Sequence, residues 1–239
     1  MELVVLASGK GTRLKKLNQN HPKCLLRIKN EKTLIDYISK NFIKFEKTFI
    51  IAGYKHHLLK KYEKKNVKLI INKKYNTTNM VYSLWCAKKS ISSDIIVVYA
   101  DILFDERIIN KLIKKKGNIL PLKKNWLEVW KSRMSYKKIK MDSENIVLKN
   151  NKIIKIGGEY TKYPKAQYMG IIKFRKKDFF KAMNFFKNSN NYKIDMTSFL
   201  DLCIKNKIID LSYFLTNRFW YEIDTPQDYK NFKKMGLKL

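Results

Sequence analysis

Residues 6–14, Leu6-Ala7-Ser8-Gly9-Lys10-Gly11-Thr12-Arg13-Leu14, carry the strongest local signal in this sequence. They follow an apolar run, residues 2–7, that is typical of a buried β-strand. Glycine lets a backbone approach an anion closely, and the first N–H groups of a helix are unpaired donors. Thr12, Arg13 and Lys23, which comes after Pro22, add donors and positive charge. The stretch therefore predicts a phosphate-binding turn.

The residues that follow predict alternating strands and helices. Strands are expected at 48–54, 67–75 and 94–101, and helices at 33–45 and 79–91. Repeated strand and helix units predict a mostly parallel sheet with helices on both faces, as in a Rossmann-like, three-layer α/β fold. The turn after the first strand then lies at the carboxyl edge of the sheet, where such folds bind ligands.

The pattern changes after residue 117. Strands are predicted at 126–134, within 138–157 and at 168–174, with Lys149-Asn150-Asn151-Lys152 as a hairpin turn. Helices are expected at 176–188 and 195–207, and a last helix with Thr225 as its N-cap and Pro226 as its first residue. We expect a single domain, 1–239, whose halves are 1–117 and 118–239, the second containing a small antiparallel subdomain.

The formal net charge is +32, from 52 lysines and arginines against 20 acidic residues. Only six of the basic residues are arginines, and the lysines are spread along the whole chain, which indicates compositional bias rather than a nucleic-acid-binding face. The charge still favours anionic substrates. Cys24, Cys86 and Cys203 are too scattered for a disulfide framework or a zinc site. Because the sequence shows neither a long uncharged apolar run nor a secretory signal pattern, we expect a cytoplasmic protein.

Two common phosphate motifs do not fit the first turn. The Walker A spacing is absent, and the dinucleotide-binding fingerprint fails because its third glycine is Leu14 here. The pattern A-[AS]-G-x-G-[ST]-R-[LM] followed by P-K does fit. On these residues the chain resembles the nucleotidyltransferases that activate sugar phosphates and small alcohol phosphates. The resemblance implies that Arg13 and Lys23 stabilise charge as pyrophosphate leaves, and that a nucleoside triphosphate is wrapped by Leu6, Ala7, Ser8, Gly9, Lys10, Gly11 and Thr12.

Three acidic residues are candidate ligands for a metal ion. Asp101 ends the apolar strand at 94–101, at the sheet edge that also carries the phosphate turn. Glu222 and Asp224 are two residues apart on an expected strand, so their side chains share a face. Divalent cations prefer such carboxylate oxygens. The resemblance implies that Asp101 and Asp224 hold Mg²⁺, and Glu222 is a third candidate.

Residues 75–85 and 220–235 resemble the phosphocholine cytidylyltransferase branch of this family. That branch includes enzymes acting on phosphocholine, 2-aminoethylphosphonate and phosphoglutamine, which implies CTP as the nucleotide, bound by 1–117, and the acceptor on 118–239. The products of such enzymes suit the decoration of a surface polysaccharide or lipid. Candidate contacts to the cytosine or ribose are the small polar residues Asn76, Thr77, Thr78, Asn79 and Ser83.

The acceptor is less defined by the sequence. A trimethylammonium group would need an aromatic cage, for which Trp126, Trp130, Tyr136, Tyr168 and Trp220 are available. An amino-acid acceptor would need a cation, for which Lys131 or Arg133 would serve. We assign Trp126, Lys131 and Tyr168 to acceptor binding. Two alternatives stay open, a hexose 1-phosphate transferase using UTP or dTTP and a basic protein that binds nucleic acid or a membrane surface. The sequence also leaves the oligomeric state open.

Overall fold

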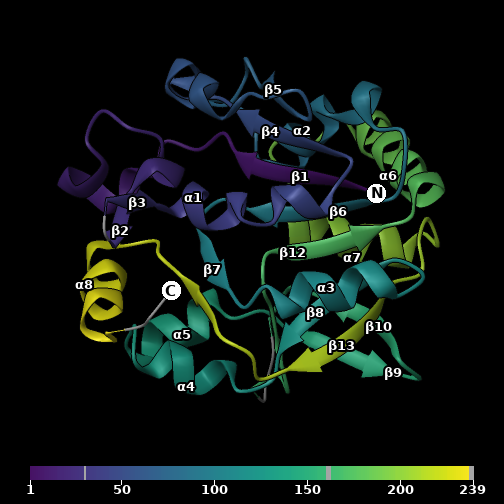
Figure 1. The fold of residues 1–239 in the computed structure, drawn as a ribbon. Helices are drawn as coiled ribbons and strands as arrows, with labels where there is room; N and C mark the ends of the chain where they lie inside the picture. Colours follow the sequence, from purple (N-terminus) through teal and green to yellow (C-terminus); the bar gives the residue numbers. More distant parts are fainter. Residues whose placement is uncertain (30, 160–162, 237–239) are drawn as a thin grey trace.

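A ten-stranded sheet organises the computed structural model, which describes residues 1–29, 31–159 and 163–236 (Figure 1). The strand order is β5-β4-β1-β6-β12-β8-β13-β10-β9, and β11 pairs with β8. The strands are β1 (Glu2–Ala7), β4 (Lys47–Ala52), β5 (Val67–Ile71), β6 (Ile95–Tyr99), β8 (Ile119–Lys123), β9 (Ile146–Lys149), β10 (Lys152–Ile156), β11 (Gln167–Tyr168), β12 (Ile171–Phe174) and β13 (Ser212–Thr216).

The first half of the sheet is parallel, as predicted. β1 pairs in parallel with both β4 and β6, and β4 pairs in parallel with β5. Alternate residues of β1 enter different cores, because Leu3 and Val5 face one side of the sheet and Val4 the other. Because β1 is buried on both faces, its sequence is the continuous apolar run of residues 2–7 rather than an alternation of apolar and polar residues.

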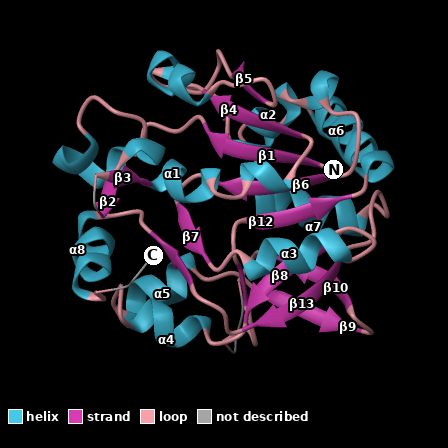
Figure 2. Ribbon diagram, in the orientation of Figure 1, coloured by secondary structure: helices cyan, strands magenta, loops and turns pink. Residues whose placement is uncertain are grey.

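Helices cover both faces of this sheet, so the three-layer prediction is confirmed (Figure 2). One layer is formed by α2 (Met80–Cys86), α6 (Lys176–Ser189) and α7 (Met196–Lys205). The other layer is formed by α1 (Leu34–Ser39), α3 (Arg107–Lys114), α4 (Trp126–Lys131) and α5 (Tyr136–Asp142). Short 3-10 helices are η1 (Thr12–Asn18), η2 (Lys23–Leu25), η3 (Phe42–Lys44), η4 (His56–Tyr62) and η5 (Lys88–Ser90).

The second half of the chain is mixed: the strand predicted at 126–134 is wrong, and the strands predicted within 138–157 occupy only the later part of that range. Residues 126–134 begin with the helix α4, and the first part of 138–157 belongs to the helix α5. Trp126 and Trp130 are four residues apart, which places both on one helical face, and their rings meet edge to face at 5.3 Å. The expected hairpin is confirmed between β9 and β10, with Asn150 and Asn151 in the left-handed region. β12 is antiparallel to β6, whereas β13 is parallel to β8.

Two small two-stranded sheets lie outside the main sheet. β2 (Arg27–Lys29) pairs with β3 (Lys32–Thr33), and β14 (Trp220–Glu222) pairs with β7 (Ile102–Phe104). The last helix, α8 (Pro226–Lys234), begins as predicted, with Thr225 as N-cap and Pro226 in its first turn. A third apolar core, which includes Leu14, Leu103 and Tyr221, fixes η1 and α8 to these sheets.

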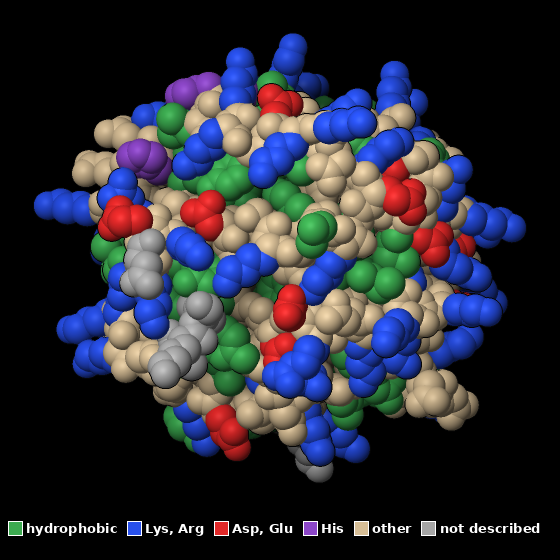
Figure 3. All heavy atoms as spheres, in the orientation of Figure 1, with side chains coloured by type: hydrophobic (Ala, Val, Ile, Leu, Met, Phe, Trp, Pro, Cys, Tyr) green, Lys and Arg blue, Asp and Glu red, His purple; other side chains and the backbone are tan. Residues whose placement is uncertain are grey.

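The surface agrees with a charge that is spread rather than gathered. Lysine and arginine side chains are distributed over the whole face seen in Figure 3, with acidic side chains between them. Within the described residues, every helix is too short or too polar to cross a lipid bilayer.

Candidate active site

The phosphate turn packs directly on Lys23. Gly11 has a φ of 68°, in the left-handed region, and a Cβ there would lie 2.7 Å from Cβ of Lys23 and 2.8 Å from Nδ2 of Asn18. The amide of Asn18 donates a 2.7 Å hydrogen bond to the carbonyl of Lys10 and so holds the turn in shape. Gly11 is therefore required both for the backbone conformation and for the approach of Lys23.

The other residues predicted to wrap the nucleotide divide into two groups. Leu6 and Ala7 end β1, and the buried hydroxyl of Ser8 donates to the carbonyl of Ile51 at 3.0 Å. Gly9, Lys10 and Thr12 are exposed around the turn. Ser8 therefore stabilises the strand end, whereas the exposed residues leave backbone and side-chain donors open to a ligand.

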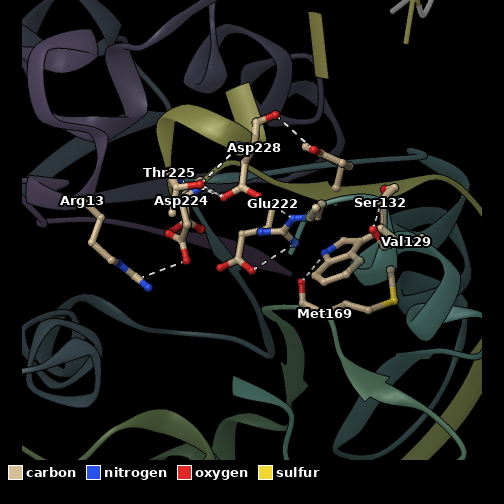
Figure 4. A network of polar contacts seen from close by, with 12 residues as sticks. Arg13, Val129, Ser132, Met169, Glu222, Asp224, Thr225 and Asp228 are labelled. Carbon is tan, nitrogen blue, oxygen red and sulfur yellow. Dashed lines mark hydrogen bonds and ion pairs between the residues drawn. The ribbon is translucent and has the colours of Figure 1, made fainter. Parts of the chain in front are cut away.

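The two residues predicted to be catalytic meet the acidic residues at this edge of the sheet. The Lys23 ammonium lies 2.7 Å from Oδ2 of Asp101 and also pairs with Asp224. Arg13 lies 3.0 Å from the same Asp224, a contact marked by a dashed line in Figure 4. Burial opposes the Lys23 charge, but Asp101, Asp224 and Glu222 together raise its pKa above the usual value. Lys23 is therefore a fixed cation.

Asp101, Glu222 and Asp224 come together although 121 residues separate the first from the second. Asp101 lies in the turn between β6 and β7, and Glu222 ends β14, so Asp224 lies just beyond the strand on which it was expected. One carboxylate oxygen from each lies within 4.8 Å of the others. Within the described part of the chain, the buried Oδ1 of Asp101 has no hydrogen-bond partner. Burial and the neighbouring carboxylates of Asp224 and Asp101 raise the pKa of Glu222. An orphaned oxygen among three crowded carboxylates fits a divalent cation.

Asp228, which sequence reasoning did not assign, fixes the loop that carries Asp224. Its Oδ2 accepts hydrogen bonds from the backbone N–H groups of Asp224 at 3.1 Å and Thr225 at 2.8 Å, as Figure 4 shows. Its Oδ1 accepts a 2.9 Å hydrogen bond from Nε of the buried Arg133. The sequence signal was the spacing Thr225-x-x-Asp228, which is a capping box at the start of α8.

A cavity of about 300 Å³ opens beside these carboxylates. Of the residues assigned to the acceptor, Tyr168 lines this cavity. Trp126 is buried elsewhere and donates from Nε1 to the carbonyl of Pro164 at 2.9 Å. Lys131 places its ammonium 5.3 Å over the ring of Tyr136, outside the cavity lining. Other residues of the lining are Tyr99, Trp130, Arg133, Glu144, Gln167, Asp195, Thr197 and Trp220.

Two of the residues predicted to contact the base bind Asn72, which sequence reasoning missed. The Asn72 amide donates to the hydroxyls of Thr78 at 3.2 Å and Ser83 at 3.0 Å. Asn79 accepts from the N–H of Met80 and donates to the carbonyl of Lys193. Asn76 and Thr77 are exposed on the loop. Asn72 thus holds the loop before α2 in place through Thr78 and Ser83. The contacts of these residues with a base stay a prediction.

Comparisons with known proteins agree with this fold. Residues 3–120 match the model of the MobA-like NTP transferase domain. A CTP:phosphoglutamine cytidylyltransferase of Campylobacter jejuni subsp. jejuni is 30% identical over 95% of this chain and 97% of its own length. The solved structure of CTP:phosphocholine cytidylyltransferase from Streptococcus pneumoniae covers 98% of both chains at a TM-score of 0.78 and 22% identity. An inositol-1-phosphate CTP transferase from T. maritima covers all of this chain and 97% of its own at a TM-score of 0.77 and 21% identity.

The fold, the glycine turn and the full-length similarity together define a nucleotide-transferring enzyme. The chain belongs to the nucleotidyltransferase family that activates sugar phosphates and phosphocholine, within its cytidylyltransferases.

Proposed function

We propose that this protein transfers the cytidylyl group of CTP to a small phosphorylated amine or amino acid, with Mg²⁺, and releases a CDP-linked product and pyrophosphate. The observation that carries the proposal is the meeting of Lys23 with Asp101, Glu222 and Asp224 beside the turn of Gly11. A fixed cation, a carboxylate cluster and a glycine turn at one sheet edge suit a triphosphate and its counter-ions. The named relative acts on phosphoglutamine with CTP, which supports this substrate class.

In this reaction an oxygen of the acceptor phosphate attacks the α-phosphorus of CTP. The bond between that phosphorus and the oxygen bridging to the β-phosphate breaks, and its electron pair leaves with pyrophosphate. Lys23 and Arg13, which both contact Asp224, would neutralise charge on the triphosphate. Positioning and charge neutralisation supply most of the acceleration in such transfers.

Asp101, Glu222 and Asp224 would hold the Mg²⁺. When bound, the ion would neutralise phosphate charge and orient the oxygens of the triphosphate. The side chains themselves are held for this purpose, because Asp228 fixes the backbone of Asp224 and the strand pair β7–β14 holds Glu222 opposite Ile102. Lys23 shares two of these carboxylates and so compensates their charge from within the protein.

The proposal is tested by pyrophosphate release from purified protein and Mg²⁺, with CTP, UTP, dTTP, ATP or GTP against phosphoglutamine, phosphocholine, 2-aminoethylphosphonate and glucose 1-phosphate. We expect turnover with CTP and a small phosphorylated amine or amino acid. Turnover confined to UTP or dTTP with glucose 1-phosphate would refute the proposal in favour of a hexose branch.

Two variants locate the chemistry. Lys23→Ala and Asp101→Asn should each lower kcat by about a hundred- to a thousand-fold, the cost of losing one group that stabilises transition-state charge. Matched controls are Lys187→Ala and Asp210→Asn, whose side chains are exposed on the surface and should leave the rate unchanged. Circular dichroism checks that each variant is folded, and wild-type rates in either active-site variant would contradict the assignment.

A further inference from the structure

The lining of the cavity beside the carboxylate cluster has the opposite balance of acidic and basic residues to the whole molecule. The protein carries a formal charge of +32. Among the described residues of the cavity lining, however, acidic side chains outnumber basic ones by six to three. The acidic ones are Asp142, Glu144, Asp195, Glu222, Asp224 and Asp228, and the basic ones are Arg13, Arg133 and Lys138. Such a lining favours a ligand group with positive charge.

Most of these carboxylates already have partners. Asp228 is bonded to Arg133 and to the start of α8, and Glu222 and Asp224 belong to the cluster with Asp101. Asp195 caps α7, accepting from the backbone N–H and the hydroxyl of Ser198, both at 2.8 Å. Asp142 is exposed to solvent at the end of α5. Among the described residues of this lining, Glu144 is the carboxylate that has a fully buried oxygen without a hydrogen-bond partner.

Glu144 is fixed in place and short of hydrogen-bond donors. Its Oε2 is buried, with no partner among the residues that the structure describes. Its Oε1 lies 2.8 Å from the hydroxyl of Thr197, but that hydroxyl is also 2.7 Å from Asp195 and has a single hydrogen to give. The side chain of Gln167 binds both the N–H and the carbonyl of Glu144, so its backbone is held. A buried carboxylate with at most one donor is costly unless a ligand supplies more.

Arg133, which lines the same cavity, is short of a hydrogen-bond acceptor. Its Nε donates to Asp228, and its guanidinium lies over the ring of Tyr221 at 5.1 Å. Its Nη1 is buried and lacks an acceptor within the described part of the chain, because Oε2 of Glu222 is 3.7 Å away. That distance is too long for a hydrogen bond. A carboxylate on the ligand would supply the missing acceptor.

We propose that the acceptor is zwitterionic, a phosphorylated amino acid whose ammonium group is bound by Glu144 and whose carboxylate is bound by Arg133. The inference rests on the proposed cytidylyl transfer and names the substrate class of that same cavity. A protonated amine brings three N–H donors to Glu144, whereas a trimethylammonium group has none to give. A choline-type acceptor would leave both Oε2 of Glu144 and Nη1 of Arg133 unsatisfied.

The test crosses one variant with a series of acceptors in the pyrophosphate assay with CTP. Glu144→Gln keeps the shape of the side chain and removes its charge. With phosphoglutamine, kcat/KM should fall about 10- to 100-fold, the usual effect of losing a hydrogen bond between charged groups. With the analogue of phosphoglutamine that lacks the α-ammonium group, the kcat/KM values of the variant and the wild type should agree within about threefold. The reason is that this analogue has no ammonium group for Glu144 to bind. Glu159→Gln, at an exposed position, is the matched control and should behave as wild type with every acceptor.

Arg133 is tested through the substrate, because its pairing with buried Asp228 makes its own substitution disruptive. The wild-type enzyme should use the analogue that lacks the α-carboxylate about 10-fold or more less well than phosphoglutamine. The inference is overturned, with cytidylyl transfer intact, if Glu144→Gln slows every acceptor equally or if phosphocholine is the preferred acceptor. Absence of pyrophosphate from CTP with every acceptor would instead overturn the proposed function and this inference with it.

Discussion

Substituting Glu144 by glutamine should make the ligand-free protein more stable at alkaline pH. Burial is the main cause that raises the pKa of the Glu144 carboxyl to about 7, from an ordinary 4.5, and the neighbouring Asp195 adds to it. Between pH 4.5 and 7 the folded protein therefore holds a proton on Glu144 that the unfolded chain has lost. Stability from this group is full below pH 4.5 and is lost as the pH rises through about 7.

The size of this effect on stability follows from the difference between the folded and ordinary pKa values of Glu144. About 2.5 pKa units at 1.36 kcal/mol each correspond to about 3 kcal/mol of unfolding free energy by pH 8.5. For a chain of this length, about 2–4 °C in Tm accompanies each kcal/mol, so Glu144→Gln should melt about 6–12 °C above wild type at pH 8.5. At pH 4.5 the wild-type carboxyl is protonated when folded, and the two proteins should melt within about 2 °C of each other.

The assay is thermal unfolding of wild type, Glu144→Gln and Glu159→Gln from pH 4.5 to 8.5, followed by circular dichroism. The exposed Glu159 controls for the loss of one negative charge from a strongly basic protein. If Glu144→Gln is equal to or less stable than wild type at pH 8.5, Glu144 is satisfied within the protein and the reasoning fails. Such a gain in stability, combined with a loss of activity, is expected where a site is built for a ligand.

Two further substitutions test how the site is held. Gly11→Ala should lower kcat/KM at least 10-fold, because its Cβ would press on Lys23 at 2.7 Å. Gly117→Ala, which also has a positive φ but no atom within 4 Å, should cost only the backbone strain, about 1–2 kcal/mol in urea unfolding, and no activity. Equal activity in the two variants would argue against the contact with Lys23. Asp228→Asn should lose about 3–5 kcal/mol in the same assay, because it removes the charge of the nearer of the two carboxylates beside the buried guanidinium of Arg133, Glu222 being 3.7 Å away. The exposed ion pair of Asp210 with Lys152 should contribute little. A loss below 1 kcal/mol for Asp228→Asn would contradict the importance of its pairing with Arg133.

The parallel half of the fold was predictable because its signals are local. The apolar runs that became β1, β4 and β6 are bounded by turn residues, and the phosphate turn follows β1 directly. The strand at 126–134 was mispredicted because Trp126 and Trp130, four residues apart, satisfy both the helical period and an alternation of two. Burial against the sheet, which the local pattern does not contain, favoured the helix α4.

The candidate site also contains residues that a local motif predicts and one residue that no local motif predicts. Lys23, Asp101 and Asp224 could be found because each stands in a local motif, even though their contact joins distant parts of the chain. Glu144 stands in no motif, between a short helix and a hairpin. It becomes conspicuous only when β11 and α7 bring Gln167, Thr197 and Asp195 around it. A shortage of hydrogen-bond donors is a property of three-dimensional neighbours, so a sequence pattern cannot report it.

In the proposed reaction, the spread of lysines and the acidic residues of the cavity would act at different stages. The positive charge spread over the face seen in Figure 3 would attract CTP and phosphorylated acceptors alike, without discriminating between them. Discrimination then falls to a lining where Glu144 and Asp195 oppose a bare phosphate and favour one that also carries a cation. Because surface attraction is screened by salt and a buried contact much less, raising the ionic strength should weaken the apparent affinity for all anionic ligands while leaving the preference among acceptors largely unchanged. Electrostatic attraction by the surface and acceptor selectivity in the cavity can therefore be measured separately. The comparison of Glu144→Gln across acceptors measures selectivity alone.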